Sequence, residues 1–473
     1  MLAIHNYPSP AAAAALERIV GRSLLFSRRE TDRVGRILED VRRRGDAALL
    51  DYTRRYDAPG FSPAQLVPGA EEEAAARRVG KAFRAALSRA AANIEAFHRR
   101  QLRPGFALAE RPGTLLGQLV RPVERAGVYV PGGPGGTTPL VSSVLMGALP
   151  AKTAGVPEIV MVSPPRKDGR IDPRLLAAAR AAGVTQVFKV GGPWAIGALA
   201  FGTETIPRVD VIVGPGNLYV TLAKRLVAGT VGIDLVAGPS ELVVVADAAA
   251  DPAFIAADLL AQAEHDALAS VVLLTDRREL AVAVSAAMEG QLPRLGRAAI
   301  ARRAVRDYGA ALVTADLEAA FGVANRLAPE HLELHLEDPW AWLPRVRHAG
   351  AVFLGRWAPE AAGDYLAGPN HVLPTVGTAR FASALSVDHF LKKTSLVYYA
   401  EEALRREAAD IVRLAEAEGL EAHARSVRLR FPGGVGLRPV SARGRPAGGA
   451  DSRARDARAA VRAARGRGGR RGS

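Results

Sequence analysis

Apolar residues recur at helical spacing through the first hundred positions of the chain. One set lies three or four residues apart, as a single helix face requires: Val34, Ile37, Leu38 and Val41. Gly45 is expected to end this helix, and Asp46 to cap the next one over 47–56. A further long helix is predicted around 71–99. Residues 1–105 are therefore predicted to form an N-terminal helical segment.

After residue 105 the pattern changes to short apolar runs that end in glycine. The runs cover 127–130, 186–190 and 209–213, and helical sequence follows each of them. This repeated order predicts parallel strands joined by crossover helices. Glycine after such strands lets a ligand approach the backbone, and the helix N-termini favour phosphate. The turn 214–216 lacks the third glycine of a full dinucleotide fingerprint, so it is either an ordinary tight turn or part of a nucleotide crevice.

A second α/β segment begins near residue 238. Strands are predicted over 241–246 and 270–275, with a helix over 254–265 between them. Gln262 and His265 lie three apart on that helix and share one face, which suits two ligands of one metal. Spacing alone favours an ordinary exposed helix end, because Gln and His are common there.

Composition narrows the class of protein. The chain has 473 residues, of which 49% are hydrophobic and 5% aromatic. This length allows two to four domains, and the mixture suits an α/β enzyme better than an all-β sandwich. No apolar run reaches the roughly 18 residues that span a bilayer, so no membrane association is expected. The N-terminus lacks the features of a signal peptide, so the cytoplasmic location is the default expectation.

The chain contains no cysteine, which excludes disulfides, thiolate zinc sites and a cysteine nucleophile. A transition metal must then be held by nitrogen and oxygen ligands. The nine histidines that can contribute are His5, His98, His265, His331, His335, His348, His371, His389 and His423.

The net charge of +15 raises the question of nucleic-acid binding. Residues 441–473 hold ten Arg and two Asp, a net +8, which leaves only +7 for the body. The segment 436–473 is rich in Arg and Gly and is predicted to be a disordered tail. Weak phosphate contacts with RNA are one interpretation, but no aromatic residues are present for base stacking. A solvated extension is the favoured interpretation, and no nucleic-acid partner is expected.

Three further segments carry candidate chemistry. Glu330-His331 follows a proline and forms a candidate acid/base pair, whereas His335 in the next strand is expected to be a surface or packing residue. The Gly- and Pro-rich loop 363–375 contains Asp, Asn and His side chains. Glu418 and His423 lie five apart and converge only if the glycine between them bends the chain.

Taken together and in this order, these segments resemble the histidinol dehydrogenase family over roughly residues 15–430. The matching segments are Val128–Gly133, Gly214–Asn217, Ala237–Glu241, Gln262–His265, Ala328–Glu333, Gly363–Tyr365, Asn370–Thr375 and Ala422-His423. Such a set is far more specific than any single motif.

The resemblance implies an NAD-dependent oxidation of L-histidinol to L-histidine through the aldehyde, the last step of histidine biosynthesis. It implies two NAD per turnover, one Zn²⁺ per subunit, and a homodimer with shared active sites. The implied fold is α/β, with two incomplete Rossmann-like domains over 106–237 and 238–390. The C-terminal residues 391–435 are expected to be a helical dimerisation segment.

The resemblance also implies a role for each matching residue. The implied zinc ligands are Gln262, His265, Asp364 and His423 of the partner subunit. The implied substrate contacts are these four together with Ser240, His331 and Glu418. Glu330 and His331 are the implied acid/base pair, with His331 accepting the alcohol proton and Glu330 serving the water-addition step. The zinc is expected to orient the substrate.

The implied NAD contacts include one departure from the family pattern. Tyr129 and Asn217 match, but Pro193-Trp194 stands where the family commonly has Ala-Gln. Trp194 cannot replace the glutamine acceptor and is expected to stack on part of the nucleotide instead. Pro369 replaces a common Thr. Two alternatives stay open: a related zinc and NAD alcohol dehydrogenase for another polar alcohol, and a non-catalytic protein that binds RNA through the tail.

Overall fold

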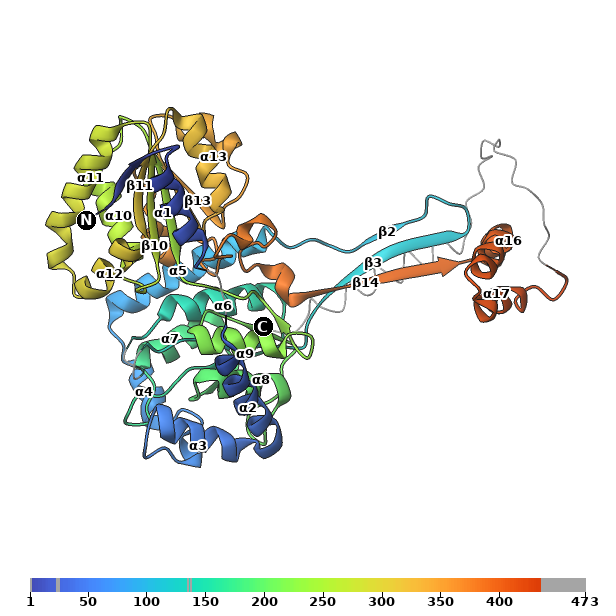
Figure 1. The fold of residues 1–473 in the computed structure, drawn as a ribbon. Coiled ribbons are helices and arrows are strands. Elements are labelled where there is room, and N and C mark those ends of the chain that lie inside the picture. Colours follow the sequence, from blue (N-terminus) through green and yellow to red (C-terminus); the bar gives the residue numbers. More distant parts are fainter. Residues whose placement is uncertain (1, 23–25, 134–135, 137, 435–473) are drawn as a thin grey trace. The chain divides into compact units, whose positions relative to one another are not determined.

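The structure is a computed structural model that describes residues 2–22, 26–133, 136 and 138–434 (Figure 1). The chain divides into two compact units. The first is built from residues up to 102 and from 122–392, and the second from 103–121 and the described residues after 392. The basic tail predicted over 436–473 lies outside the described residues. Within the described ranges, no helix is both long and apolar enough to cross a membrane.

The first unit contains a five-stranded parallel sheet in the order β6-β5-β4-β7-β8. Its strands are β4 (Arg125–Tyr129), β5 (Glu158–Val162), β6 (Gln186–Phe188), β7 (Val211–Val213) and β8 (Gly232–Ile233). The strand order reverses between β4 and β7, and such a reversal is where parallel sheets commonly bind ligands, at the carboxyl ends of the strands. The three strand–helix units expected from the glycine-ended runs are therefore present.

Helices cover both faces of this sheet. The helices α5 (Lys81–Arg99), α6 (Val141–Ala154) and α7 (Pro173–Ala182) contribute to the core on one face. The opposite core includes α2 (Arg28–Arg44), α3 (Asp46–Tyr56), α8 (Gly192–Phe201) and α9 (Leu218–Val227). The buried residues of α2 are those that the helical spacing indicated: Val34, Ile37, Leu38 and Val41.

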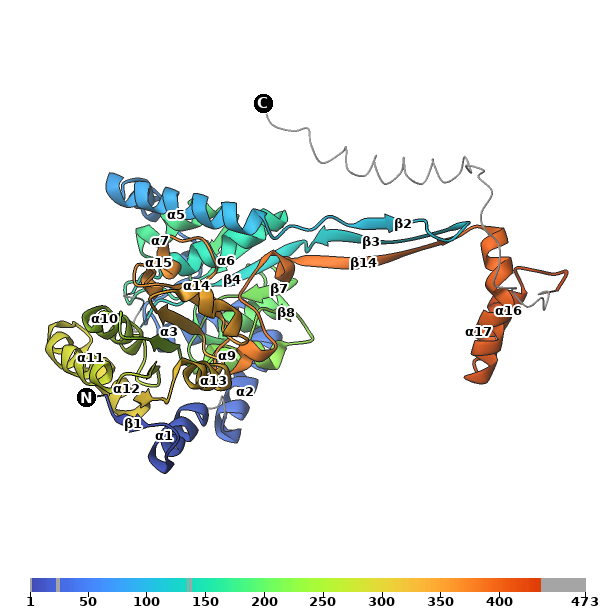
Figure 2. The same cartoon turned by 90° about the horizontal axis from the view of Figure 1, so that it is seen from above.

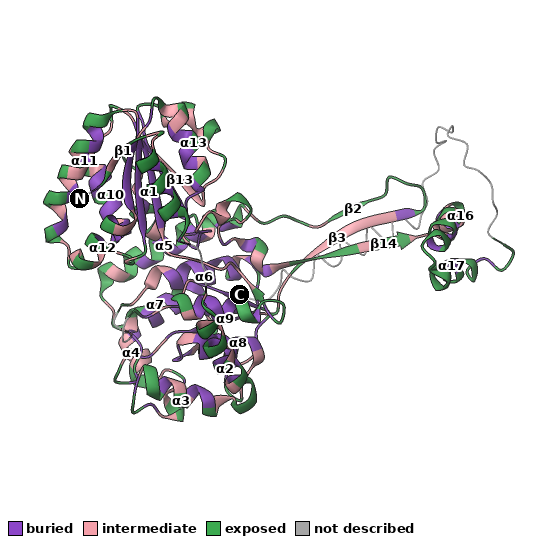
Figure 3. Cartoon of the chain, in the orientation of Figure 1, coloured by how far each residue is buried: buried purple, intermediate pink, exposed green. Residues whose placement is uncertain are grey.

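The second sheet of this unit has six parallel strands in the order β1-β11-β10-β9-β12-β13. They are β1 (Ile4–Asn6), β9 (Glu241–Ala246), β10 (Ser270–Thr275), β11 (Gly309–Val313), β12 (His331–His335) and β13 (Ala351–Leu354). The order reverses between β9 and β12. The strands β9, β10 and β12 are almost wholly buried (Figure 3).

Helices also cover both faces of the second sheet. One core includes α10 (Pro252–Ala263), α11 (Arg278–Gln291) and α12 (Ala298–Tyr308). The other includes α1 (Pro10–Val20) and α13 (Leu317–Leu327). The short helix α15 (Glu360–Tyr365) follows β13. The α/β class with parallel sheets is thus confirmed.

The N-terminal segment differs in two details from the expected run of helices. Its first strand, β1, pairs with β11, with Ile4 opposite Ala311. The long helix expected around 71–99 is two helices, α4 (Ala70–Arg77) and α5, and Gly80 is the N-cap of the second. Helical spacing runs through both, but glycine at the junction disfavours a continuous helix.

The second unit is a narrow sheet joined to a helical pair. The sheet has the order β14-β3-β2, and its strands are β2 (Phe106–Leu108), β3 (Thr114–Pro122) and β14 (Leu391–Tyr399). These strands run side by side in both views of the ribbon (Figures 1 and 2). Helices α16 (Glu401–Ala417) and α17 (Glu421–Arg428) share a small apolar core. Residues 391–399 are therefore a strand, although the sequence predicted helix from 391 onward.

Candidate functional site

The predicted acid/base pair, Glu330 and His331, lies at the amino ends of β9 and β12, where the strand order of the second sheet reverses. Glu241 opens β9, His331 opens β12, and His331 is in register with Leu242. The chain reaches β12 from α13 through Ala328, which adopts a left-handed conformation with φ 48°. Pro329 then fixes the backbone before Glu330. This turn brings two consecutive ionisable residues into the protein interior.

Glu330 is buried, and its Oε2 accepts a hydrogen bond from the N–H of Glu241 at 3.0 Å. Burial raises the pKa of Glu330 well above its usual value, and the nearby negative charge of Glu241 acts in the same direction. Hydrogen bonds from that N–H and from Ser240 oppose the shift. Since burial dominates, this carboxyl group is able to hold a proton at pH values where an exposed glutamate is ionised.

His331 is buried beside Glu330, and burial lowers its pKa to about 4. Its Nδ1 lies 3.1 Å from the carbonyl oxygen of Glu241. A carbonyl oxygen only accepts, so Nδ1 carries the proton and donates it. The Nε2 atom of the neutral ring then has a free lone pair. Burial therefore keeps the ring neutral, and the carbonyl of Glu241 sets the tautomer that a proton acceptor needs.

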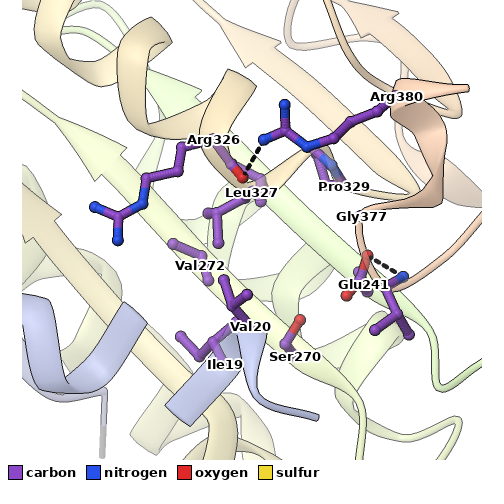
Figure 4. Close-up of a pocket in the computed structure, with 12 residues that line it drawn as sticks. Ile19, Val20, Glu241, Ser270, Val272, Arg326, Leu327, Pro329, Gly377 and Arg380 are labelled. Atoms are coloured by element: carbon purple, nitrogen blue, oxygen red, sulfur yellow. Dashed lines mark hydrogen bonds between the residues drawn. The ribbon is translucent and has the colours of Figure 1, made fainter. Parts of the chain in front are cut away.

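Glu241 is itself held by its side chain. Its Oε1 lies 2.6 Å from the guanidinium of Arg22, which also donates to Ser270 at 2.8 Å. Its Oε2 accepts from the N–H of Val376 at 3.1 Å. Glu241 lines a cavity of 260 Å³ together with Ser270 and Arg380 (Figure 4). The N-terminal segment therefore contributes, through Arg22, to the support of the acid/base pair.

The predicted metal ligands of the first unit come together at the end of α10, in the turn that follows it, and on α15. Gln262 ends the buried face of α10, and His265 follows one turn later. Asp364 lies on α15, and the donor atoms of His265, Glu360 and Asp364 are all within 4.8 Å of one another. Gln262 accepts the N–H of Glu241 at 3.0 Å and donates to Glu360 when its amide is oriented to satisfy both neighbours.

Glu360 is a site residue that the sequence analysis did not identify. It is buried, four residues before Asp364 on the same helix face, and its Oε1 lies 3.7 Å from Nδ1 of His331. Burial raises its pKa well above the usual value, and Asp364 and Glu330 reinforce the shift. A spacing search for two carboxylates at i and i+4 would have found it.

The donor set fits a divalent cation held by nitrogen and oxygen. Several carboxyl groups share this small volume, and Arg22, which approaches it, is already paired with Glu241. His371 adds a buried Nε2 that has no hydrogen-bond partner among the described residues. A positive ion would offset the carboxylate charge, and thiolates are not required for such a set.

A second buried polar cluster, formed by Glu333, His335 and Asp258, lies on the face of β12 that carries His331. Glu333 Oε2 is 3.2 Å from Nε2 of His335, and that nitrogen is 3.5 Å from Oδ2 of Asp258 on α10. His335, which was expected to be a surface or packing residue, is buried and contacts the carboxylate of Glu333. Periodicity in the sequence predicts the helix that carries Asp258 and the strand that carries Glu333. It does not predict that the two side chains lie close together.

The three predicted NAD contacts belong to the first sheet. Tyr129 ends β4, is buried, and accepts the N–H of Gly192 on its hydroxyl at 3.2 Å. Trp194 is also buried, with its ring stacked on Tyr52 and Tyr56 at 5.7 and 5.5 Å. Asn217 is exposed, follows β7, and caps α9. The nucleotide contacts of these residues, including stacking by Trp194, stay predictions.

Glu418 and His423 belong to the second unit. Glu418 ends α16, His423 lies in α17, and both are exposed. Gly419 between them has φ 72°, a conformation that favours glycine. The bend on which their convergence was conditional is therefore present. The structure brings Ser240, Gln262, His265, Glu330, His331 and Asp364 together at the second sheet of the first unit.

The chain is similar to known proteins over most of its length. The sequence profile described as histidinol dehydrogenase matches residues 22–431. The chain is 55% identical to a histidinol dehydrogenase of Desulfotalea psychrophila, covering 88% of this chain and 96% of that protein. It is 51% identical to one from Syntrophotalea carbinolica, covering 91% and 99%.

A solved structure gives the same result for the fold. The histidinol dehydrogenase of Elizabethkingia anophelis superposes with a TM-score of 0.84 at 36% identity, covering 91% of this chain and 98% of that one. The profile match spans most of the chain and includes every residue of the acid/base and metal-ligand groups. The chain belongs to the histidinol dehydrogenase family.

Proposed function

We propose that the protein oxidises L-histidinol to L-histidine through histidinal, using two NAD in succession and one Zn²⁺ per subunit. The observation that carries the proposal is the placement of a neutral histidine and a protonatable glutamate beside a nitrogen and oxygen donor set. Family membership makes the protein an NAD-dependent oxidoreductase. An oxidation of an alcohol requires a proton acceptor at the substrate hydroxyl, and His331 has the free nitrogen for it.

In the first step, His331 takes the hydroxyl proton of histidinol on Nε2 as hydride passes to the nicotinamide, which gives histidinal. In the second step, the ionised form of Glu330 removes a proton from the water that adds to the aldehyde carbon, and its raised pKa makes it a stronger base than an exposed glutamate. A second hydride transfer from the hydrate then gives the carboxylate. The absence of cysteine excludes a covalent thiohemiacetal at this stage. Neighbouring residues thus divide the two proton transfers.

The zinc ion is assigned to Gln262, His265 and Asp364, with His423 of the partner subunit as the fourth ligand. Held by these residues, zinc would supply positive charge that orients the substrate. Ser240 lies next to Glu241 and is assigned to the substrate together with Glu418. The adjacent Glu360 adds a carboxylate that strengthens the attraction for a cation.

We assign NAD to the crevice at the carboxyl ends of β4 and β7. A crevice at a reversal of strand order is where nucleotides bind in parallel sheets, and the N-terminus of α9 favours phosphate. Asn217 uses its side-chain oxygen for the cap of α9, which leaves its amide nitrogen for a ligand. Tyr129 and Trp194 complete the proposed contacts.

We propose that the protein is a homodimer with shared active sites. The second unit exposes large apolar side chains on its sheet and its helices: Phe106, Leu108, Val397, Tyr398, Leu414 and Leu429. Exposed apolar surface of this extent is typical of a protein–protein interface. Glu418 and His423 lie in this same unit, so a partner chain is the proposed source of both residues.

The decisive experiment is the formation of NADH from L-histidinol, with and without a metal chelator. We expect activity with histidinol, loss of activity after chelation, and recovery on addition of Zn²⁺. Other amino alcohols and sulfonated alcohols serve as competing substrates. Absence of turnover with histidinol, alongside turnover of another alcohol, would refute the proposed substrate. Undiminished activity after complete removal of the metal would refute the role of zinc.

A further inference from the structure

The short helix α15 carries two of the acidic residues of the site, yet little within the helix itself fixes its position. It has six residues, and its N-cap, Pro359, offers no side-chain hydrogen bond. Helices this short are not stable by themselves, and their first N–H groups need acceptors from outside. The position of Glu360 and Asp364 must therefore depend on the surface against which α15 packs.

One side of that surface is the buried carboxylate of Glu333 on β12. Its Oε1 accepts the N–H of Glu360, the first residue of α15, at 2.9 Å. Its Oε2 is held by His335, which in turn contacts Asp258 on α10. Burial, with the charge of Glu333, raises the pKa of Asp258 to about 7, so this group retains a proton near neutral pH. Two carboxyl groups thereby share one enclosed space.

The other side is the ring of Phe353 on β13, the residue directly opposite Glu333 in the sheet register. A Cβ atom at Gly363 would lie 2.7 Å from Cε1 of this ring, so only glycine allows the helix to approach so closely. The Phe353 ring centroid is 6.0 Å from that of His331. Glu333 therefore contacts the first residue of α15, and Phe353 contacts Gly363, the residue before Asp364.

We propose that Glu333 and Phe353 are positioning residues that seat α15 and so align Glu360 and Asp364 with His265. This inference rests on the proposed zinc-dependent function, and it extends it to residues that touch neither metal nor substrate. Hydrogen-bonded partners of metal-binding elements commonly affect metal affinity by about 10- to 100-fold. Phe353 also lies beside the ring of His331, so the same residue contacts both α15 and the proposed proton acceptor.

A pair of substitutions separates position from charge. Glu333→Asp keeps the charge but withdraws the carboxylate from the N–H of Glu360, whereas Glu333→Gln removes the charge but keeps an acceptor oxygen in reach. The matched controls are Glu279→Asp and Glu279→Gln, at an exposed glutamate in the first turn of α11. All variants are made in the full chain and checked by circular dichroism and thermal melting.

The measurements are Zn²⁺ affinity by competition with a chromogenic chelator, and kcat and KM for histidinol. For Glu333→Asp we expect Zn²⁺ affinity and kcat/KM to fall about tenfold or more, and for Glu333→Gln both to stay within about threefold of wild type. The two control variants are expected to stay within that same range. Unchanged affinity in a folded Glu333→Asp variant overturns the proposal, and so does a tenfold loss in Glu333→Gln.

Gly363→Ala is a second route to the same test, and it applies even if Glu333→Asp fails to fold. Its added methyl group displaces α15 from Phe353, so we expect a loss of Zn²⁺ affinity of about tenfold. A folded Gly363→Ala variant with wild-type affinity contradicts the role of the seat. The wild-type chain could fail to oxidise histidinol while the Zn²⁺ affinities of the variants change as expected. That result would refute the proposed substrate but not the positioning role of Glu333 and Phe353.

Discussion

Glu330 and His331 are neighbours in the chain, and the same environment affects them in opposite directions. Burial disfavours the charged form of each, so the pKa of the glutamate rises and that of the histidine falls. Near neutral pH the His331 ring is therefore neutral and able to accept a proton. The raised pKa of Glu330 favours the protonated form of its carboxyl group, which is able to exchange that proton. Sequence identified the pair, but not the two shifts, because burial depends on the packing of α10 and α15 above it.

The division of labour within this pair gives a prediction for Glu330→Gln. The amide keeps the size of the side chain but cannot take a proton from water. We expect Zn²⁺ to stay bound, histidinal to be the product that accumulates, and NADH to form in a ratio near one per histidinol. Product analysis and NADH stoichiometry measure this. An unchanged rate of histidine formation would count against the assigned role.

Arg22 gives a second prediction at this scale. Arg22→Met leaves the Glu241 carboxylate buried without its ion pair, and such losses cost about 3–5 kcal/mol of unfolding free energy. The matched control is Arg345→Met, which breaks an exposed pair with Glu318 and should cost under about 1 kcal/mol. Urea unfolding monitored by circular dichroism compares them. Equal losses in the two variants would contradict the support role of Arg22.

At the scale of elements, most helices and strands could be predicted because their apolar spacing is regular. The helix α2 and the strands β4, β7, β9 and β10 all lie close to their expected ranges. The strand β1 was missed because it is three residues long and is stabilised by β11, about 300 residues away. Glu360 has a local signal, its i, i+4 spacing to Asp364, but only the packing of α15 beside Gln262 of α10 places it at the site.

The end of α3 provides a test of pH dependence. Burial raises the pKa of Asp57 to about 7, and its Oδ2 has no hydrogen-bond partner among the described residues. Since the folded pKa lies above the unfolded one of about 3.9, the contribution to stability is complete below pH 4 and is lost as pH rises through 7. We expect wild type to lose about 3 kcal/mol relative to Asp57→Asn over that range.

Urea unfolding of both proteins at several pH values between 4 and 8 checks this expectation. The difference in unfolding free energy between wild type and Asp57→Asn should change steadily across the window and level off above it. A difference that is independent of pH would mean that Asp57 titrates normally in the folded protein.

At the scale of the whole molecule, the proposed ligand set requires two chains. If His331 and His423 act in the same site but come from different subunits, then His331→Ala and His423→Ala are each inactive alone. After mixing under conditions that allow subunit exchange, half of the dimers are mixed, and each has one intact site. We therefore expect recovery of about a quarter of wild-type activity.

The matched control for this experiment mixes His331→Ala with Glu330→Gln. Both residues are contributed to a site by the same chain. In a mixed dimer, one site therefore lacks His331 and the other lacks Glu330. Each mixed dimer has two damaged sites, so no recovery of histidine formation is expected, although Glu330→Gln sites still release NADH from the first oxidation. Recovery in this control, or its absence in the first mixture, would contradict sharing of the site.

The pairing of β1 with β11 has a consequence for synthesis of the protein. Residues 4–6 leave the ribosome about 300 residues before their partner strand, which ends at residue 313. At translation rates of about 5–20 residues per second, roughly 15–60 seconds pass between the synthesis of β1 and that of β11. Arg22 likewise precedes its partner, Glu241, by more than two hundred residues. Strand β1 and Arg22 are thus added to their partners late, and the site cannot assemble in the order in which it is translated.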